Sequence, residues 1–251
     1  MIDKTPASPG PGRAPIKVLP QYWQDEPSRR KYVDRLFDGT AGEYDFVERL
    51  LGLGRGPGYR RDALLRAGLA PGMKVLDVAT GTGLVAREAL SIVGPEGSVT
   101  GLDPSAGMLE QARTLEFGIV RGLGERLPFR DASFDFVSMG YALRHVADLP
   151  ALFGEMKRVL RPGGTACVLE LTRPRNQTAA TSLRLYMTRI VPAIAHVAGR
   201  PGAGELMRFY WDTIDACVQP HAVLAAMKAA GFERPQRVTA MRMFSDYTAR
   251  A

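Results

Sequence analysis

The sequence predicts an α/β fold, a mostly parallel sheet covered by helices on both faces. Short apolar runs of strand length alternate with amphipathic runs of helical length through most of the chain. Parallel strands need a crossover connection, and a helix between successive strands provides one. At 251 residues the chain is long enough for one such domain with a full core.

Seven segments are expected to be strands. They are residues 74–78, 98–102, 118–121, 134–139, 165–171, 234–239 and 242–248. Helices are expected over residues 83–92, 105–115 and 149–160, with a last helix over residues 221–230. Because two strands follow that last helix directly, the terminal strand is expected to insert antiparallel.

The first 70 residues differ from the rest of the chain. Residues 1–20 contain five prolines and are expected to form a disordered arm. Residues 21–70 are expected to form an N-terminal helical lid, with a break near residues 39–42 where two glycines occur. Residues 71–251 are expected to form the main domain.

Charge and cysteine content exclude few functions. The formal net charge of +7 permits contact with nucleic acid or an anionic membrane, but it does not determine the fold. Two cysteines, Cys167 and Cys217, do not form a disulfide framework, and they fit a reducing cytoplasm. The three histidines are far apart in the sequence and lack a metal-ligand spacing, so no metal is expected.

A glycine turn follows the first expected strand. Residues 75–83, Val-Leu-Asp-Val-Ala-Thr-Gly-Thr-Gly, lead from a strand into a helix that starts near Leu84. Glycine lets a ligand lie against bare backbone, and the helix start offers unpaired N–H donors. We expect Gly81, Thr82 and Gly83 to hold a nucleotide-like cofactor. The same stretch also matches the dinucleotide pattern G-x-G-x-x-[G/A], so an NAD-dependent oxidoreductase is an alternative.

Two aspartates favour S-adenosylmethionine over a dinucleotide. Asp77, at the end of the first strand, is expected to face the positive charge of this cofactor and would repel a pyrophosphate. Asp103 ends the second strand, 20 positions after Gly83, and is expected to accept both ribose hydroxyls. The alternative is that Asp77 is a solvated turn residue and Asp103 a helix cap.

Several stretches between about Leu36 and the C-terminus form recognisable motifs. They are Tyr44-Asp45, residues 75–83, residues 125–129, Leu143-Arg144-His145 and Arg161-Pro162-Gly163-Gly164. In these stretches the sequence resembles the quinone C-methyltransferases of ubiquinone and menaquinone biosynthesis. The cofactor loop and the Arg-Pro-Gly-Gly stretch are typical of class I methyltransferases in general, whereas Tyr44-Asp45 and Leu143-Arg144 indicate the quinone branch. The resemblance implies a Rossmann-like class I methyltransferase that methylates an aromatic or quinol-like acceptor.

The resemblance also implies roles for individual residues. It gives an active role to Arg144, a supporting role to Tyr44 from the lid, and cofactor contacts to Gly140 and to the backbone of Leu123 and Gly124. The chain departs from the family pattern at three positions. Leu123 stands near where the family has a polar residue for the adenine amino group, and His145 and Glu48 each replace an asparagine.

For the chemistry, we expect His145 to act as the general base and Arg144 to stabilise the resulting phenolate. A histidine of ordinary pKa, about 6.5, is largely neutral near pH 7 and can take a proton from a ring hydroxyl. The alternative is that both residues only support the local backbone.

Other readings stay open at this stage. A helix over residues 182–197 either walls a lipophilic substrate pocket and rests on an anionic bilayer, or is a core helix.

An RNA methyltransferase fits the net charge, but Met139-Gly140-Tyr141 replaces the usual base-methylation motif. A third reading is a catalytically weak partner subunit. We expect a cytoplasmic protein without a nucleic-acid partner. Carbon or oxygen methylation, contact with the inner face of the membrane, and a homodimer are left open.

Overall fold

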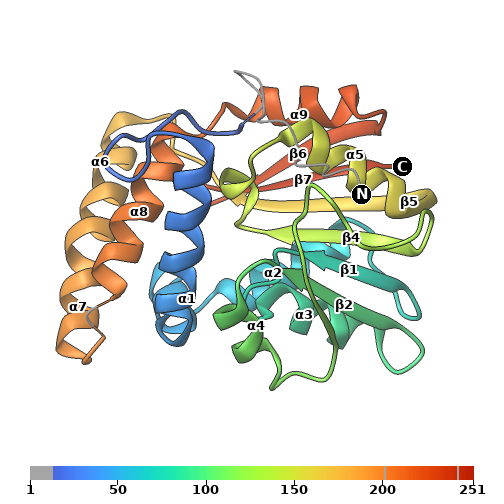
Figure 1. Cartoon of the computed structure of the whole chain (residues 1–251), viewed down its shortest axis with the longest axis horizontal. Helices are drawn as coiled ribbons and strands as arrows, with labels where there is room; N and C mark the ends of the chain where they lie inside the picture. Colours follow the sequence, from blue (N-terminus) through green and yellow to red (C-terminus); the bar gives the residue numbers. More distant parts are fainter. Residues whose placement is uncertain (1–13, 201, 242) are drawn as a thin grey trace, which may run out of the picture.

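The computed structural model describes residues 14–200, 202–241 and 243–251, and it contains a seven-stranded sheet with helices on both faces (Figure 1). The strands are β1 (Lys74–Val78), β2 (Ser98–Asp103), β3 (Gly118–Arg121), β4 (Phe134–Gly140), β5 (Leu160–Leu171), β6 (Glu233–Ala240) and β7 (Phe244–Arg250). Their order is β3-β2-β1-β4-β5-β7-β6. Pairs among β1 to β5 are parallel, and β7 pairs antiparallel with both β5 and β6. The predicted fold class is therefore confirmed, including the antiparallel insertion of the last strand.

The two faces of the sheet follow from the alternation of side chains along each strand. In β1, Leu76 and Val78 pack into one core with α5 (Leu149–Val159) and α9 (Pro220–Ala229). Val75 faces the other way, into a core with α2 (Gly56–Arg66) and α3 (Leu84–Val93). Successive residues of a strand point to opposite faces, so an apolar strand has to be covered on both sides.

The short helix α4 (Ala106–Ala112) follows β2 and ends earlier than predicted. Its N-cap is Ser105, whose Oγ accepts a hydrogen bond from the backbone N–H of Met108 at 3.1 Å. Asp148 caps α5 in the same way through the N–H of Ala151. These caps satisfy backbone donors that have no partner within the helix.

Residues 26–51 of the expected lid form one unbroken helix, α1 (Glu26–Leu51), which is called the lid from here on, so the expected break at residues 39–42 was wrong. A capping box at Asp25 and Ser28 starts the helix. Its inner side is buried and carries Leu36, Ala41 and Val47. A glycine inside a helix costs only about 1 kcal/mol relative to alanine. The tertiary packing of this helix offsets that cost at both glycines.

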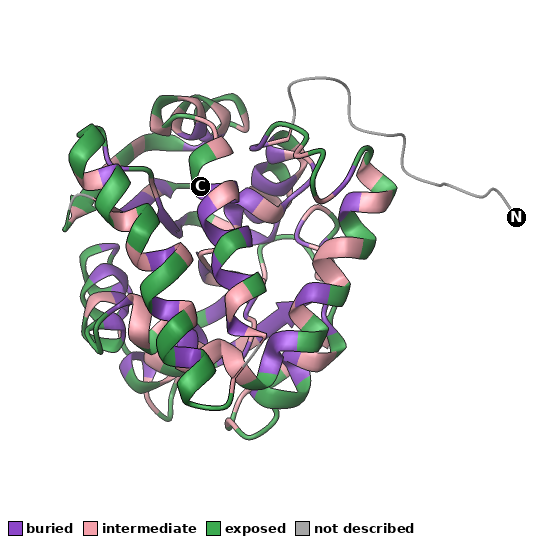
Figure 2. Cartoon of the chain, turned by 90° about the vertical axis from the view of Figure 1, so that its left-hand side faces the viewer, coloured by how far each residue is buried: buried purple, intermediate pink, exposed green. Residues whose placement is uncertain are grey.

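Four further helical segments pack with α1 into a layer outside the sheet. They are α6 (Gln177–Leu185), the π-helical turn η2 (Tyr186–Ile190), α7 (Val191–Val197) and α8 (Ala203–Ala216). The predicted helix over residues 182–197 lies within this run, whereas α8 was not predicted although its apolar residues recur at helical spacing. Figure 2 views the layer face on, with exposed residues on the outer sides of its helices and buried residues toward the core.

Part of the predicted arm lies in the described structure. Residues 1–13 are outside the described residues, but Ile16 is buried and forms a bridge with Cys217. The N–H of Val218 donates to the carbonyl oxygen of Pro15 at 2.7 Å. The expectation of disorder was therefore wrong for residues 14–20, because this segment has apolar and backbone partners next to the end of α8.

Candidate active site

A cavity opens at the carboxyl ends of β1, β2 and β4, beneath the lid helix α1. Its walls are Arg29, Arg30, Val33, Asp34, Phe37, Tyr44, Val78, Ala79, Gly81, Asp103, Pro104, Met108, Leu123, Gly124, Glu125, Met139, Gly140, Tyr141, Ala142, His145, Val146 and Ala147. Ligands of open α/β sheets bind at this edge, in the crevice beyond the strand ends. Of the predicted site residues, the structure brings seven to the cavity: Tyr44, Gly81, Asp103, Leu123, Gly124, Gly140 and His145.

The turn between β1 and α3 forms one wall. Gly81 has a φ of +58°, and a Cβ placed there would meet nothing within 4 Å, so this glycine leaves open space on the cavity side. Gly83 has a φ of +88°, and a Cβ there would lie 2.6 Å from Leu115 Cδ1. The first glycine thus exposes backbone to a ligand, while the second permits close packing at the start of α3.

Asp103 shapes the adjacent wall. Its Oδ2 accepts a hydrogen bond from the N–H of Gly81 at 2.9 Å, and its Oδ1 accepts one from the N–H of Ser105 at 2.8 Å. Burial raises the pKa of Asp103 to about 6, against the lowering effect of these two hydrogen bonds. Each carboxylate oxygen keeps a further lone pair, so the geometry suits two hydroxyl donors from a ribose.

Asp77 does not face the cavity, which corrects the expectation that it meets the charge of the cofactor. It is 1% exposed, and its carboxylate accepts hydrogen bonds from Thr80 Oγ1 and Ser138 Oγ, both at 2.7 Å. Burial raises its pKa to about 6. Asp77 thus braces the turn from behind, so it no longer distinguishes S-adenosylmethionine from a dinucleotide.

The lid contacts the carboxyl edge of the sheet at three points that the sequence had not indicated. Asp45 accepts a hydrogen bond from Thr82 Oγ1 at 2.6 Å. The hydroxyl of Thr82, a predicted cofactor residue, therefore donates its proton to the lid. Asp38 accepts from Ser105 Oγ at 2.6 Å and from the N–H of Gly107 at 3.0 Å. Arg29 donates to the carbonyl oxygen of His145 at 2.7 Å. The lid is therefore docked over the loops that follow β1, β2 and β4.

Two further glycines allow close packing at the floor of the cavity. A Cβ at Gly124 would lie 2.8 Å from Leu152 Cδ1, and one at Gly140 would lie 2.5 Å from Val85 Cγ2. The neighbouring Glu125 accepts a hydrogen bond from the N–H of Ala147 at 2.6 Å. This contact links the loop after β3 to the loop after β4. Glu125 belonged to a family motif, but its position in the cavity wall was not predicted.

His145 lines the cavity in an apolar environment. Its ring stacks on Phe209 at a centroid distance of 5.3 Å and meets the edge of Phe37 at 5.3 Å. Neither ring nitrogen has a hydrogen-bond partner among the described residues. Burial, with smaller contributions from Arg144 and Arg29, lowers its pKa well below 6.5. The assumption of an ordinary pKa was therefore wrong, and a neutral imidazole of this kind is a weak base.

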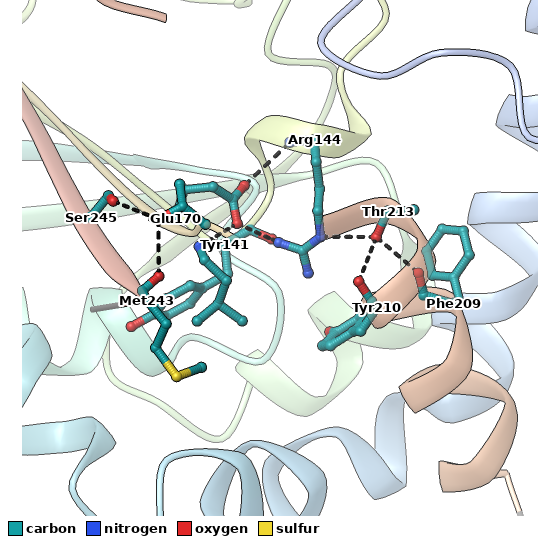
Figure 3. Close-up of polar contacts among 10 residues, drawn as sticks. Tyr141, Arg144, Glu170, Phe209, Tyr210, Thr213, Met243 and Ser245 are labelled. Carbon is teal, nitrogen blue, oxygen red and sulfur yellow. Dashed lines mark hydrogen bonds and ion pairs between the residues drawn. The ribbon is translucent and has the colours of Figure 1, made fainter. Parts of the chain in front are cut away.

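Arg144 is fully buried behind the cavity, in a polar network (Figure 3). Its guanidinium lies between an ion pair with Glu170 and a hydrogen bond from Nε to Thr213 Oγ1 at 3.1 Å. Nη1 also donates to the carbonyl oxygen of Tyr141 at 2.8 Å, whereas Nη2 has no described partner. Arg144 is thus neutralised by Glu170 and fixes the backbone of Tyr141. Glu170 was given no role from the sequence, although it lies near the end of the buried strand β5.

Tyr44 extends from the lid to the aromatic end of the cavity. Its ring lies 6.4 Å from those of both Phe37 and Tyr210, and its hydroxyl shares a hydrogen bond with that of Tyr210. Burial raises the pKa of Tyr44, so its hydroxyl stays protonated near neutral pH. Tyr44 can therefore orient an aromatic ligand but is not an available base.

The cavity residues fit S-adenosylmethionine. Asp103 offers acceptors for the ribose, and Gly81 leaves room for the ligand against the turn. Pro104, Met108, Leu123 and Val146 provide apolar surface for an adenine ring. Among the described residues, no group of three or more His, Cys, Asp and Glu side chains is arranged to hold a metal ion.

The comparisons with known proteins agree with this geometry. Residues 25–239 match the model of the ubiE/COQ5 methyltransferase family. The chain is 32% identical over 211 residues to the ubiquinone/menaquinone biosynthesis C-methyltransferase of Hahella chejuensis, covering 81% of this chain and 84% of that protein. It is 37% identical over 203 residues to a demethylmenaquinone methyltransferase of Mycobacterium sp. (strain JLS), covering 80% and 86%.

Solved structures show the same fold at lower identity. Phosphoethanolamine N-methyltransferase 2 of Haemonchus contortus, in complex with S-adenosyl-L-methionine, gives a TM-score of 0.62 at 16% identity, covering 88% of this chain and 59% of that one. A SAM-dependent methyltransferase of Thermotoga maritima gives 0.59 at 21% identity, covering 86% and 98%. The chain is an S-adenosylmethionine-dependent methyltransferase and belongs to the ubiE/COQ5 methyltransferase family.

Proposed function

We propose that the protein transfers a methyl group to a ring carbon of a hydroquinol in a quinone pathway. The observation that carries this proposal is the two-part cavity. One end presents the turn at Gly81 and the carboxylate of Asp103, and the other end presents the rings of Phe37, Tyr44 and His145. A flat aromatic acceptor matches the second end, and the curated relatives are named for ubiquinone or menaquinone biosynthesis.

The chain contributes mainly by positioning and by excluding water. S-adenosylmethionine, when bound, supplies an electrophilic methyl group. Asp103 and Gly81 would hold the cofactor, and Leu123, Gly124 and Gly140 would shape its site. The lid covers the cavity through Asp38 and Asp45, so the acceptor would meet the methyl group in a confined site. Correct placement of two reactants is a large part of catalysis.

The decisive assay supplies radiolabelled S-adenosylmethionine and 2-prenyl-1,4-naphthohydroquinol under reducing conditions. We expect label in the ring, with mass spectrometry and NMR placing the new methyl on carbon. Phosphoethanolamine and an unstructured RNA serve as competing acceptors and should stay unlabelled. Label on oxygen, or label only in an amine or in RNA, would contradict the proposal.

A peripheral contact with an anionic bilayer is supported by the outer surface of the α6 to α7 run. Leu185, Ile190, Ile194 and Val197 are exposed there by 55%, 45%, 43% and 89%. The five-residue step from Leu185 to Ile190 spans the π-helical turn, which brings these positions toward one face. Arg184 and Arg189 are also exposed, and no Asp or Glu occurs from residue 172 to residue 204. An apolar stripe with basic neighbours suits an anionic surface.

No described helix is both long and apolar enough to cross a membrane. We expect sedimentation with phosphatidylglycerol vesicles but not with phosphatidylcholine vesicles, and loss of sedimentation in Ile194→Glu/Val197→Glu. Light scattering on both proteins tests whether the face joins two copies instead. A dimer that the double variant converts to a monomer, without vesicle binding, would contradict the membrane contact.

A further inference from the structure

A second, smaller cavity lies beside the aromatic end of the first. Its wall includes Glu48 from α1, Tyr141 after β4, Tyr210 from α8 and Phe244 from β7. Tyr44 and Tyr141 line both cavities, so the two spaces adjoin across these rings. The smaller cavity thus lies next to the space assigned to the acceptor.

The hydroxyl of Tyr141 is an unpaired hydrogen-bonding group among the described residues. It is buried, and none of those residues offers it a hydrogen-bond partner. A buried hydroxyl without a partner destabilises the folded state, so such groups are rare without a reason. The Tyr141 hydroxyl is also near two charges. Burial raises its pKa, the Arg60 charge opposes this rise, and the Glu48 charge adds to it.

The backbone holds Tyr141 in an uncommon conformation. Its φ is +59°, in the left-handed region that non-glycine residues seldom adopt. Its N–H donates to the carbonyl oxygen of Leu169 at 2.7 Å, and its carbonyl oxygen accepts from Arg144 Nη1 at 2.8 Å. Figure 3 shows the carbonyl directed to Arg144 and the ring extending to the other side. Strain that surrounding contacts maintain is common at ligand sites.

Glu48 is the acidic wall of the same cavity and is fixed by a buried arginine. Its Oε1 forms an ion pair with Nη1 of Arg60, whose side chain is 1% exposed. Gly56 leaves room for this pair, since a Cβ there would lie 2.6 Å from Glu48 Oε1. Glu48 therefore presents an ordered carboxylate, which can only accept hydrogen bonds.

We propose that the Tyr141 hydroxyl and the Glu48 carboxylate together bind one ring hydroxyl of the acceptor. A ligand hydroxyl can donate to Glu48 and accept from Tyr141 at the same time, which satisfies the orphan hydroxyl. A ketone or a methyl ether has no proton to donate and would place an acceptor oxygen against the carboxylate. The site therefore selects phenolic acceptors over their ethers, and hydroquinols over the oxidised quinones. This inference rests on the proposed function, because it assigns a subsite to that acceptor.

The test compares binding of 1-naphthol and 1-methoxynaphthalene by fluorescence titration, in the presence of S-adenosylhomocysteine. We expect the wild type to bind the naphthol at least tenfold more tightly than the ether. Tyr141→Phe should reduce this preference by about fivefold to tenfold, the equivalent of one lost hydrogen bond. Its melting temperature should stay the same or rise, because the removed hydroxyl has no protein partner.

Two further variants make the result specific. Glu48→Gln should also reduce the preference, although its melting temperature should fall because Arg60 loses its counter-charge. Tyr186→Phe is the matched control, since its hydroxyl donates to the carbonyl oxygen of Leu50 outside either cavity. The control should keep the full preference.

An unchanged preference in Tyr141→Phe, with the fold intact, would overturn the inference. So would an equal affinity of the wild type for both probes. Because these measurements need no turnover, they are independent of the methyl-transfer assay. Failure of that assay alone would contradict the proposed acceptor and not the hydroxyl subsite.

Discussion

The two ends of the active-site cavity differ in how their polar groups are satisfied. At the cofactor end, Asp77 and Asp103 each accept at least two hydrogen bonds from the protein. At the acceptor end, Tyr141, Arg144 and His145 each carry buried polar atoms without a partner among the described residues. The carboxylates at the cofactor end thus have protein donors before a ligand binds, and Asp103 keeps lone pairs for the ribose, whereas the Tyr141 hydroxyl and the His145 ring nitrogens have no described partner at all.

Because of this difference, specificity for the substrate can reside at the acceptor end. The turn at the cofactor end is held in one shape by hydrogen bonds within the protein. An unsatisfied, strained region gains most from a ligand that supplies the missing partners. Variants at each end of the cavity test this difference.

The largest effect on stability is expected from Glu170→Ala, which removes the counter-charge of Arg144 at the acceptor end. Arg144 and Glu170 are 0% and 1% exposed, so removing the carboxylate leaves a buried positive charge without its counter-charge. Breaking such a pair costs about 3–5 kcal/mol of unfolding free energy. Urea denaturation measures this loss, and Glu170→Gln should lose less because it keeps a hydrogen-bond acceptor. Equal stability of Glu170→Ala and wild type would show that the pair contributes nothing.

The next effect is a pH dependence at the cofactor end. Burial raises the pKa of Asp103 from 3.8 to about 6, so the folded protein keeps a proton that the unfolded chain releases in this range. The contribution of this group to stability is therefore present below pH 4 and lost as the pH rises through about 6. A rise of this size corresponds to about 3 kcal/mol.

Asp103→Asn removes this titration, which gives the measurement. The difference in unfolding free energy between variant and wild type should shift in favour of the variant as the pH rises from 4 to 7. A pH-independent difference would show that Asp103 does not titrate in this window. Binding of S-adenosylmethionine should weaken in the variant above about pH 6, where Asp103 of the wild type is a carboxylate, since an amide accepts fewer hydrogen bonds than a carboxylate.

Gly81→Ala separates ligand contact from backbone strain. Its φ of +58° makes alanine unfavourable by about 1 kcal/mol, and the added methyl would enter the cavity. Gly163→Ala is the control, because Gly163 has a φ of +79° and open space on a turn away from the cavity. Both should lose similar stability, but only Gly81→Ala should bind S-adenosylmethionine at least tenfold more weakly by calorimetry. Equal affinities would remove Gly81 from the cofactor site.

The smallest effect is expected from Asp45→Asn on the lid. The variant weakens the hydrogen bond from Thr82, which is worth about 0.5–1.5 kcal/mol. We expect the KM for S-adenosylmethionine to rise a few fold with little change in melting temperature. Faster hydrogen exchange in α1 would show that this contact keeps the lid closed, and unchanged exchange would argue against it.

Local features of the chain determined the sheet and the cofactor turn. Each predicted strand falls on an observed one, because an apolar run of strand length between helices has few other ways to bury both faces. The turn at Gly81 lies within one strand–turn–helix segment, so its residues are neighbours in sequence as well as in space. The position of Gly81 at the cavity could be predicted for this reason, and that of Asp103 because it ends the next strand, which pairs parallel with β1.

The acceptor end, in contrast, depends on contacts between distant segments of the chain. Glu48, Arg60 and Tyr210 come from three separate helices and Tyr141 from the loop after β4. No spacing in the sequence brings these residues together. Packing also turned Asp77 away from the cavity and lowered the pKa of His145. The local sequence had instead suggested that Asp77 faces the cofactor and that His145 has an ordinary pKa. Burial and hydrogen-bond satisfaction depend on what surrounds a side chain in three dimensions, and distant segments of the chain provide those surroundings.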